Sequence, residues 1–253
     1  MAIWLIGGTQ ESAELAQQII KVGLPCVVTV TTASARSLYP ATPGLQLRVG
    51  GLSTEQISDF LQAYQVGCIL DASHPFAVEI SRLAIATARQ LQLPYLRYER
   101  PGISAPTQAS LLRLSDFQTL LTGNYLTNQR VLLTIGYRNL AQFQDWQERT
   151  TLFARILPSV SALEAALTAG FSPDRLIALR PPLSIELEKA LWQHWQISLV
   201  VTKASGAAGG EDVKHQVAAD LGTKLIVIDR PPIAYPQLTS DLQAALKFCQ
   251  AYS

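Results

Sequence analysis

Short apolar segments alternate with amphipathic segments along the whole chain, and this alternation restricts the possible folds more than any other feature. In the first part of the chain we expect strands at residues 2–6, 25–32, 45–49, 66–70 and 95–98. The segments between them carry apolar residues at helical spacing. Strands that alternate with helices in this way predict a doubly wound parallel sheet.

The alternation resumes after a loop rich in Pro, Ser and Thr at residues 101–110, where we place a domain boundary. We expect further strands at residues 131–135, 152–156, 176–179, 197–202 and 225–228, and helices at 116–121, 140–147, 160–169, 185–195, 211–221 and 240–251. The prediction is an α/β protein of two Rossmann-like domains, with parallel sheets flanked by helices and a cleft between them. Residues 1–100 would bind a dinucleotide, and residues 101–253 would contribute to substrate and cofactor binding.

The bulk composition excludes several classes of protein. Of the 253 residues, 48% are apolar and 15% are charged, which is typical of a globular chain and not of a disordered one. A net charge of +1 gives no overall attraction to nucleic acid or to an anionic membrane, so an anionic ligand requires a local basic cluster. No apolar run approaches the roughly 20 residues of a spanning helix, so we expect a cytoplasmic protein. Three widely spaced cysteines indicate reduced core thiols and no metal site.

Gly7, Gly8 and Thr9 join the first expected strand to the first expected helix, in which Glu11 is an early residue. The third glycine of the dinucleotide fingerprint is missing. The two glycines still allow a pyrophosphate to approach the backbone at the positive end of the helix, so we assign all four residues to a cofactor site. The alternative is a plain tight turn.

The end of the second expected strand indicates which dinucleotide is bound. NAD enzymes usually place an acidic residue there, about 20 residues beyond the fingerprint. This chain instead offers the hydroxyls of Thr32 and Ser34 and the guanidinium of Arg36. These groups suit a 2′-phosphate, so the prediction is NADPH, with NADH still possible. Alternatively, Arg36 is only a solvated loop residue.

Residues 71–76, Asp-Ala-Ser-His-Pro-Phe, place a carboxylate, a hydroxyl and an imidazole at the end of a buried strand. Open α/β sheets bind their ligands at that end of the strands. Because histidine exchanges protons near neutral pH, His74 is the first candidate for the proton donor and Tyr98 the second. Ser73 is expected beside the cofactor. A structural histidine, or a proton taken from solvent, is the alternative.

Basic residues gather in two segments. Arg97 and Arg100 end the fifth expected strand and could bind carboxylates, or pair with Glu99 as a structural bridge. The run at residues 203–210 is rich in Gly, Ala and Ser and is followed by Lys214; its backbone amides could hold an anion, although the Gly-Lys-Ser/Thr ending of a P-loop is absent. The candidate substrate-binding residues are Arg97, Arg100, Arg138, Lys203, Ser205, Gly209, Gly210 and Lys214.

Taken together, these segments resemble the precorrin-6A reductase family. The resemblance spans nearly the whole chain and is carried, in the family's order and spacing, by residues 4–11, 71–76, 97–101 and 203–210, followed by Lys214. Ser12 and Ser73 stand where we would expect Ala and Thr, two mild departures.

The resemblance implies an enzyme of cobalamin (vitamin B12) biosynthesis. It would reduce the carbon-18/carbon-19 double bond of an anionic tetrapyrrole, precorrin-6A or its cobalt-containing counterpart, with a reduced nicotinamide. Two other classes of protein share part of this pattern. A short-chain-type dehydrogenase needs a Tyr-x-x-x-Lys pair, and none of the eight tyrosines has a lysine four positions on. A non-catalytic NADP-binding regulatory protein would need neither the basic residues nor the late glycine-rich run. The sequence does not predict the oligomeric state.

Overall fold

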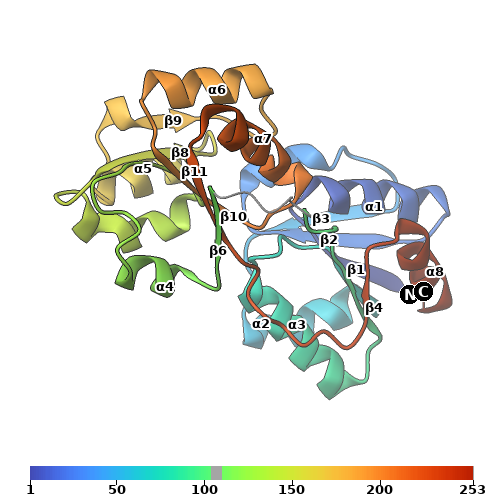
Figure 1. Cartoon of the computed structure of the whole chain (residues 1–253). Helices are drawn as coiled ribbons and strands as arrows, with labels where there is room; N and C mark the ends of the chain where they lie inside the picture. Colours follow the sequence, from blue (N-terminus) through green and yellow to red (C-terminus); the bar gives the residue numbers. More distant parts are fainter. Residues whose placement is uncertain (104–109, 253) are drawn as a thin grey trace. The chain divides into compact units, whose positions relative to one another are not determined.

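The protein is described by a computed structural model covering residues 1–103 and 110–252 (Figure 1). The chain forms two compact units, Met1–Pro101 with Pro232–Ser253, and Gly102–Pro231. Each unit contains one six-stranded sheet, and all strand pairs among the described residues are parallel. The prediction of two Rossmann-like α/β domains is confirmed.

The first sheet has the strand order β12-β5-β4-β1-β2-β3. Its strands are β1 (Ala2–Ile6), β2 (Cys26–Val30), β3 (Leu45–Val49), β4 (Val66–Asp71), β5 (Tyr95–Tyr98) and β12 (Leu238–Thr239). The connecting helices are α1 (Gln10–Lys21), the 3₁₀ segment η1 (Ala33–Leu38), α2 (Thr54–Ala63), α3 (Val78–Leu91) and the terminal α8 (Leu242–Tyr252). The chain order reverses between β1 and β4, so the turns that follow these two strands meet at a switch point, where such sheets bind ligands.

Both faces of the first sheet are covered, which explains why its strands are almost continuously apolar. Ile3 and Leu5 pack against side chains of α1 and α8. Trp4 and Ile6 point to the other face and pack against α2 and α3. At the start of α2, the side chain of Gln56 accepts the N–H of Ser53 at 3.3 Å and completes a capping box.

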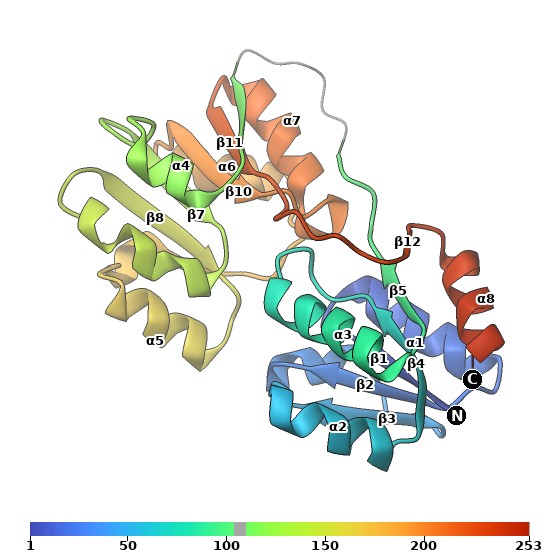
Figure 2. The same ribbon diagram turned by 90° about the horizontal axis from the view of Figure 1, so that it is seen from below.

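The C-terminal segment corrects the predicted domain boundary. We assigned all of residues 101–253 to the second domain, but Pro232–Ser253 returns to the first unit. There, β12 pairs with β5, and the two ends of the chain lie side by side (Figures 1 and 2). A Cβ at Gly67 would approach the carbonyl oxygen of Tyr252 to 2.5 Å, so the last helix packs tightly on the sheet. The two residues of β12 are too few to show strand periodicity in the sequence.

The second sheet has the strand order β6-β11-β10-β7-β8-β9. Its strands are β6 (Leu111–Leu114), β7 (Arg130–Thr134), β8 (Thr151–Ile156), β9 (Leu176–Ala178), β10 (Leu199–Lys203) and β11 (Lys224–Ile228). Its helical segments are α4 (Phe117–Thr122), η2 (Tyr137–Trp146), α5 (Val160–Thr168), η3 (Pro173–Arg175), α6 (Ile185–His194), η4 (Ala207–Gly209) and α7 (Glu211–Leu221). The edge strand β6 was not predicted, and the helix expected at 140–147 is the 3₁₀ segment η2. The switch point of this sheet lies between β7 and β10.

The interior matches the expectation for the cysteines, because Cys26, Cys68 and Cys249 are all buried free thiols. Within residues 1–103 and 110–252, no helix combines the length and apolarity that crossing a membrane requires.

Candidate active site at the switch points

Asp71 ends β4 and is the centre of a buried network of hydrogen bonds. Its Oδ1 accepts from Nη1 of Arg97 at 2.8 Å and from the N–H of Ser73 at 3.0 Å. Its Oδ2 accepts from the hydroxyls of Ser81 at 2.6 Å and Tyr95 at 2.8 Å. Burial and the charge of Asp71 raise the pKa of Tyr95, so this phenol stays protonated and donates. The network fixes the backbone of the turn that carries His74.

Arg97 lies inside this network and does not face a ligand. Only 1% of its side chain is exposed, and it donates to the hydroxyl and the carbonyl oxygen of Ser73 at 3.0 Å each. It also donates to Glu99 at 3.2 Å, and its guanidinium carbon lies 5.2 Å from the ring centre of Tyr235. Arg97 therefore forms the structural bridge to Glu99 that we gave as the alternative. We do not retain it among the candidate substrate-binding residues.

His74 is partly buried at the start of the turn. Its Nδ1 accepts the N–H of Phe76 at 3.2 Å, and its carbonyl oxygen accepts the N–H of Ala77 at 2.7 Å. Because Nδ1 is an acceptor, the neutral imidazole carries its proton on Nε2. The contact with Phe76 therefore fixes the tautomer of the neutral ring.

The first glycine turn lies beside the His74 turn, as expected from the strand order. The N-cap hydroxyl of Thr9 donates to the carbonyl oxygen of Ala72 at 3.0 Å and thereby joins the two turns. A Cβ placed on Gly8 would meet no atom within 4 Å, so this part of the backbone is open to a ligand.

The backbone amides of this turn are used differently from our expectation. The N–H groups of residues 7, 8 and 9 donate within the protein, to the carbonyl oxygen of Thr29 at 2.9 Å, the hydroxyl of Tyr39 at 2.8 Å and the hydroxyl of Ser12 at 3.0 Å. Among the described residues, the N–H groups of Gln10 and Glu11 in the first turn of α1 have no protein acceptor. Gln10 and Glu11, of which Glu11 belongs to the predicted cofactor site, therefore present N–H groups at the positive end of α1.

The segment that follows β2 presents the groups predicted for a 2′-phosphate. Ser34 and Arg36 are exposed on η1, and the hydroxyls of Thr32 and Ser34 lie 3.1 Å apart. Two hydroxyls and a guanidinium on one exposed segment fit a phosphate monoester.

Two other candidates from the first unit form an ion pair. Nε of Arg100 lies 3.1 Å from a carboxylate oxygen of Glu11. Burial and the charges of Glu11 and Glu14 raise the pKa of the nearby Tyr98, so its hydroxyl stays protonated at neutral pH. Tyr98 thus retains the proton that our second assignment requires.

The second switch point brings two predicted cations together. Lys203 ends β10, and Arg138 follows the neighbouring strand β7. A Cβ on Gly136 would lie 3.6 Å from Nζ of Lys203, which places the lysine over the turn after β7. Burial and the charge of Arg138 lower the pKa of Lys203 to about 8. This clustering of positive charge favours an anionic ligand.

The glycine-rich run after Lys203 uses several of its backbone amides within the protein. The N–H of Gly206 donates to Glu211 at 2.7 Å, and those of Gly209 and Gly210 donate to backbone oxygens at 3.0 and 2.8 Å. A Cβ on Gly209 would lie 2.0 Å from the hydroxyl of the buried Ser205, so only glycine fits there. Ser205, Gly209 and Gly210 therefore shape the run.

Lys214, on α7, is hydrogen-bonded to the glycine-rich run. Its Nζ donates to the carbonyl oxygens of Gly209 and Gly210 at 2.9 Å each, and only 1% of the residue is exposed. Burial and the charge of Arg155 lower the pKa of Lys214 to about 7. Like Arg97, Lys214 is buried and holds the backbone, here through the carbonyl oxygens of Gly209 and Gly210.

Tyr39 and Glu211 each accept a backbone N–H of a glycine turn, from Gly8 and Gly206, and no sequence motif marks either residue as functional. Glu211 directly follows the glycine run, a position that could have drawn notice. Tyr39 lies 31 positions from Gly8, and no local motif connects them.

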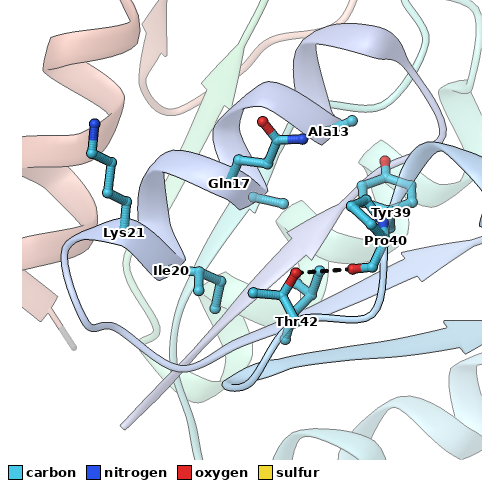
Figure 3. A pocket seen from close by; sticks show the side chains of 9 residues that line it. Ala13, Gln17, Ile20, Lys21, Tyr39, Pro40 and Thr42 are labelled. Atoms are coloured by element: carbon cyan, nitrogen blue, oxygen red, sulfur yellow. Dashed lines mark hydrogen bonds between the residues drawn. The ribbon is translucent and has the colours of Figure 1, made fainter.

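A cavity of about 270 Å³ lies between α1 and the chain that leads from η1 to β3. Figure 3 shows Ala13, Gln17 and Ile20 of α1 facing Tyr39 and Pro40 across it. Its lining is mostly apolar and contains none of the predicted site residues, so this cavity is not the candidate active site.

Two parallel α/β units with polar residues at both switch points define a Rossmann-like protein with candidate ligand sites at these points. The chain belongs to the precorrin-6x reductase family, because the family model described as Precorrin-6x reductase CbiJ/CobK matches residues 2–250. The resemblance noted in the sequence is confirmed.

Relatives match along their whole length. The chain is 48% identical to the Cobalt-precorrin-6A reductase of Synechocystis sp., over 99% of this chain and 96% of that protein. It is 32% identical to the Cobalt-precorrin-6A reductase of Priestia megaterium, over 95% of each. The solved structure titled CobK precorrin-6A reductase superposes with a TM-score of 0.81 at 25% identity, covering 99% of this chain and 96% of that one.

Proposed function

We propose that the protein catalyses the NAD(P)H-dependent reduction of the carbon-18/carbon-19 double bond of precorrin-6A, or of cobalt-precorrin-6A, in cobalamin biosynthesis. The observation that carries this proposal is family membership over residues 2–250, with 48% identity to a full-length relative. The same relative is named Cobalt-precorrin-6A reductase, which supports the cobalt-containing substrate. No observation favours the non-catalytic regulatory alternative.

The first unit would hold the cofactor, which supplies a hydride. The N–H groups of Gln10 and Glu11 would bind the pyrophosphate, in front of the open backbone at Gly8. Ser34 and Arg36 would bind the 2′-phosphate, with Thr32 at the ribose, and this assignment favours NADPH over NADH. What supports it is the exposure of both segments at the carboxyl edge of the first sheet.

His74 would supply the proton. Reduction of a conjugated double bond adds a hydride to one atom and a proton to its neighbour, and Nε2 of His74 carries a proton in the neutral ring. The hydrogen-bond network of Asp71 and Arg97 would hold the turn that carries this ring before substrate binds, so the reaction would not have to supply the entropy of orienting it. Tyr98, which is also protonated at neutral pH, is the second candidate.

The substrate's carboxylates would be held by Arg138 and Lys203 of the second unit, with Arg100 a further candidate in the first. These cations reconcile a chain of net charge +1 with a multiply anionic ligand. Lys214 and Ser205 would act indirectly, by holding the backbone that presents Lys203.

The test is anaerobic incubation of the purified protein with NADPH and either precorrin-6A or cobalt-precorrin-6A. We expect loss of NADPH absorbance and a product that is heavier by two hydrogen atoms. Binding of NADPH without turnover of either tetrapyrrole would indicate the regulatory alternative instead.

The role of His74 is tested separately. His74→Ala should lower kcat by about two orders of magnitude, the usual contribution of general acid catalysis. His194→Ala is the matched control, because His194 is exposed on α6. If the His74 variant kept turnover within a few-fold of wild type, the acid role would be wrong while the reaction itself would stand.

A further inference from the structure

Tyr39 lies outside every predicted motif and contacts the first glycine turn. It is 5% exposed; its hydroxyl accepts the N–H of Gly8 at 2.8 Å and lies 2.5 Å from Oγ of Ser12. The single hydroxyl proton of Ser12 is donated to the carbonyl oxygen of Thr9 at 2.7 Å, so Tyr39 is the donor toward Ser12. Burial raises the pKa of Tyr39, which keeps the donated proton in place.

The approach of Tyr39 also explains the glycine at position 7. A Cβ there would lie 2.4 Å from the hydroxyl of Tyr39 and 2.8 Å from Cγ1 of Val28. Gly7 does not have a positive φ, whereas Gly8 does. The absence of a side chain at Gly7 therefore makes room for the tyrosine and not for a ligand.

Tyr39 is at the same time fixed to the segment that carries Arg36. Its own N–H donates to the carbonyl oxygen of Arg36 at 3.0 Å, and Figure 3 shows its ring beside the cavity between α1 and Pro40. One residue thus joins Gly8 through its side chain and Arg36 through its backbone. The proposed function assigns these two segments to the pyrophosphate and to the 2′-phosphate.

We propose that Tyr39 is a positioning residue that fixes the separation between η1 and the first glycine turn and so sets the preference for NADPH over NADH. The inference rests on the proposed function of the first unit. NADPH must satisfy both segments at once, so loosening η1 costs affinity for it. NADH has no 2′-phosphate, and its binding does not depend on where Arg36 lies.

The test is Tyr39→Phe, which removes the hydroxyl and keeps the ring. Isothermal titration should show binding of NADPH and of 2′,5′-ADP weakened about 5- to 10-fold, the worth of one hydrogen bond. KM for NADPH should rise by the same factor with kcat unchanged. NADH, which lacks the 2′-phosphate and shares only the pyrophosphate contacts, should be weakened by a smaller factor. Tyr64→Phe is the control in the same unit, because Tyr64 packs on Phe60 at 4.9 Å.

Two further measurements keep the outcome decisive. Hydrogen exchange of the ligand-free Tyr39→Phe protein should be faster at residues 7–13, and Ser12→Ala should shift the NADPH affinity in the same direction by a smaller factor. Equal losses for NADPH and NADH, or an unchanged ratio in a folded variant, would overturn the inference. A wild-type protein that binds neither dinucleotide would refute the proposed function, whereas the exchange data would still show whether Tyr39 holds the turn.

Discussion

Replacing Asp71 by asparagine separates the charge of the buried network from its hydrogen bonds. The new amide nitrogen has two donors and faces the hydroxyls of Ser81 and Tyr95, which rotate to become acceptors. The remaining oxygen still accepts from the N–H of Ser73. What the variant removes is mainly the negative charge opposite Arg97.

The expected cost follows from the burial of Arg97. When Asp71 is replaced by a neutral residue, the remaining charged partner of Arg97 in the network is Glu99. Nε of Arg97 lies 3.2 Å from a carboxylate oxygen of Glu99, whose side chain is 17% exposed. Removing one partner of a buried ion pair costs about 3–5 kcal/mol, and because Glu99 retains part of the interaction we expect about 3 kcal/mol for the first unit. With a urea dependence of about 2 kcal/mol per molar, the unfolding midpoint should fall by about 1.5 M.

The measurement is urea unfolding, monitored by the hydrogen exchange of peptides from β4 and β5. A local probe is needed because a chain of two units need not unfold in one transition. Asp59→Asn is the matched control; Asp59 is exposed on α2, and we expect a change within about 0.5 kcal/mol. A midpoint for the Asp71 variant within about 0.3 M of wild type would refute the reasoning. Adding Arg97→Met should cost less than the sum of the two single changes, since both remove the same pair.

The remaining predictions concern the glycine turns and the cations. Lys203 has a pKa of about 8, so its ammonium is charged below this pH and neutral above it; KM for the tetrapyrrole should rise as the pH passes 8, and Lys203→Arg should flatten the profile. Gly7→Ala should destabilise the first unit by about 1–3 kcal/mol in thermal unfolding, because the added Cβ overlaps Tyr39. Gly51→Ala is the control, because a Cβ at that position meets no atom within 4 Å. Lys214→Met should raise KM for the tetrapyrrole several-fold with kcat unchanged, since the glycine run loses its internal donor; an unaltered KM would contradict that role.

The sequence predicts most elements of both sheets because their strands are buried on two faces and read as short apolar runs. The exceptions are the edge strands β6 and β12, with four and two residues. β12 is too short to show strand periodicity, and β6 directly follows the loop rich in Pro, Ser and Thr that we read as a domain boundary. They become strands only because a neighbouring strand offers free backbone groups, which is a property of the folded sheet.

Within the candidate site, residue types were predicted better than the directions of side chains. Arg97 and Lys214 were expected to face substrate, yet both are buried behind the backbone that they support. Their partners decide this, and Asp71 lies 26 positions from Arg97 in the sequence. The register of β4 and β5 sets Asp71 beside Arg97. A correct alignment of these two predicted strands would have indicated that the two residues form a pair.

The return of Pro232–Ser253 to the first unit makes that unit discontinuous in sequence, with the second unit inserted as a continuous piece. During synthesis, β12 and α8 leave the ribosome after the whole of the second unit. Because domains fold as units, the second unit is complete while the first still lacks its edge strand and one of its covering helices. The half that carries His74 and the glycine turn therefore reaches its final form only after the whole second unit has been synthesised.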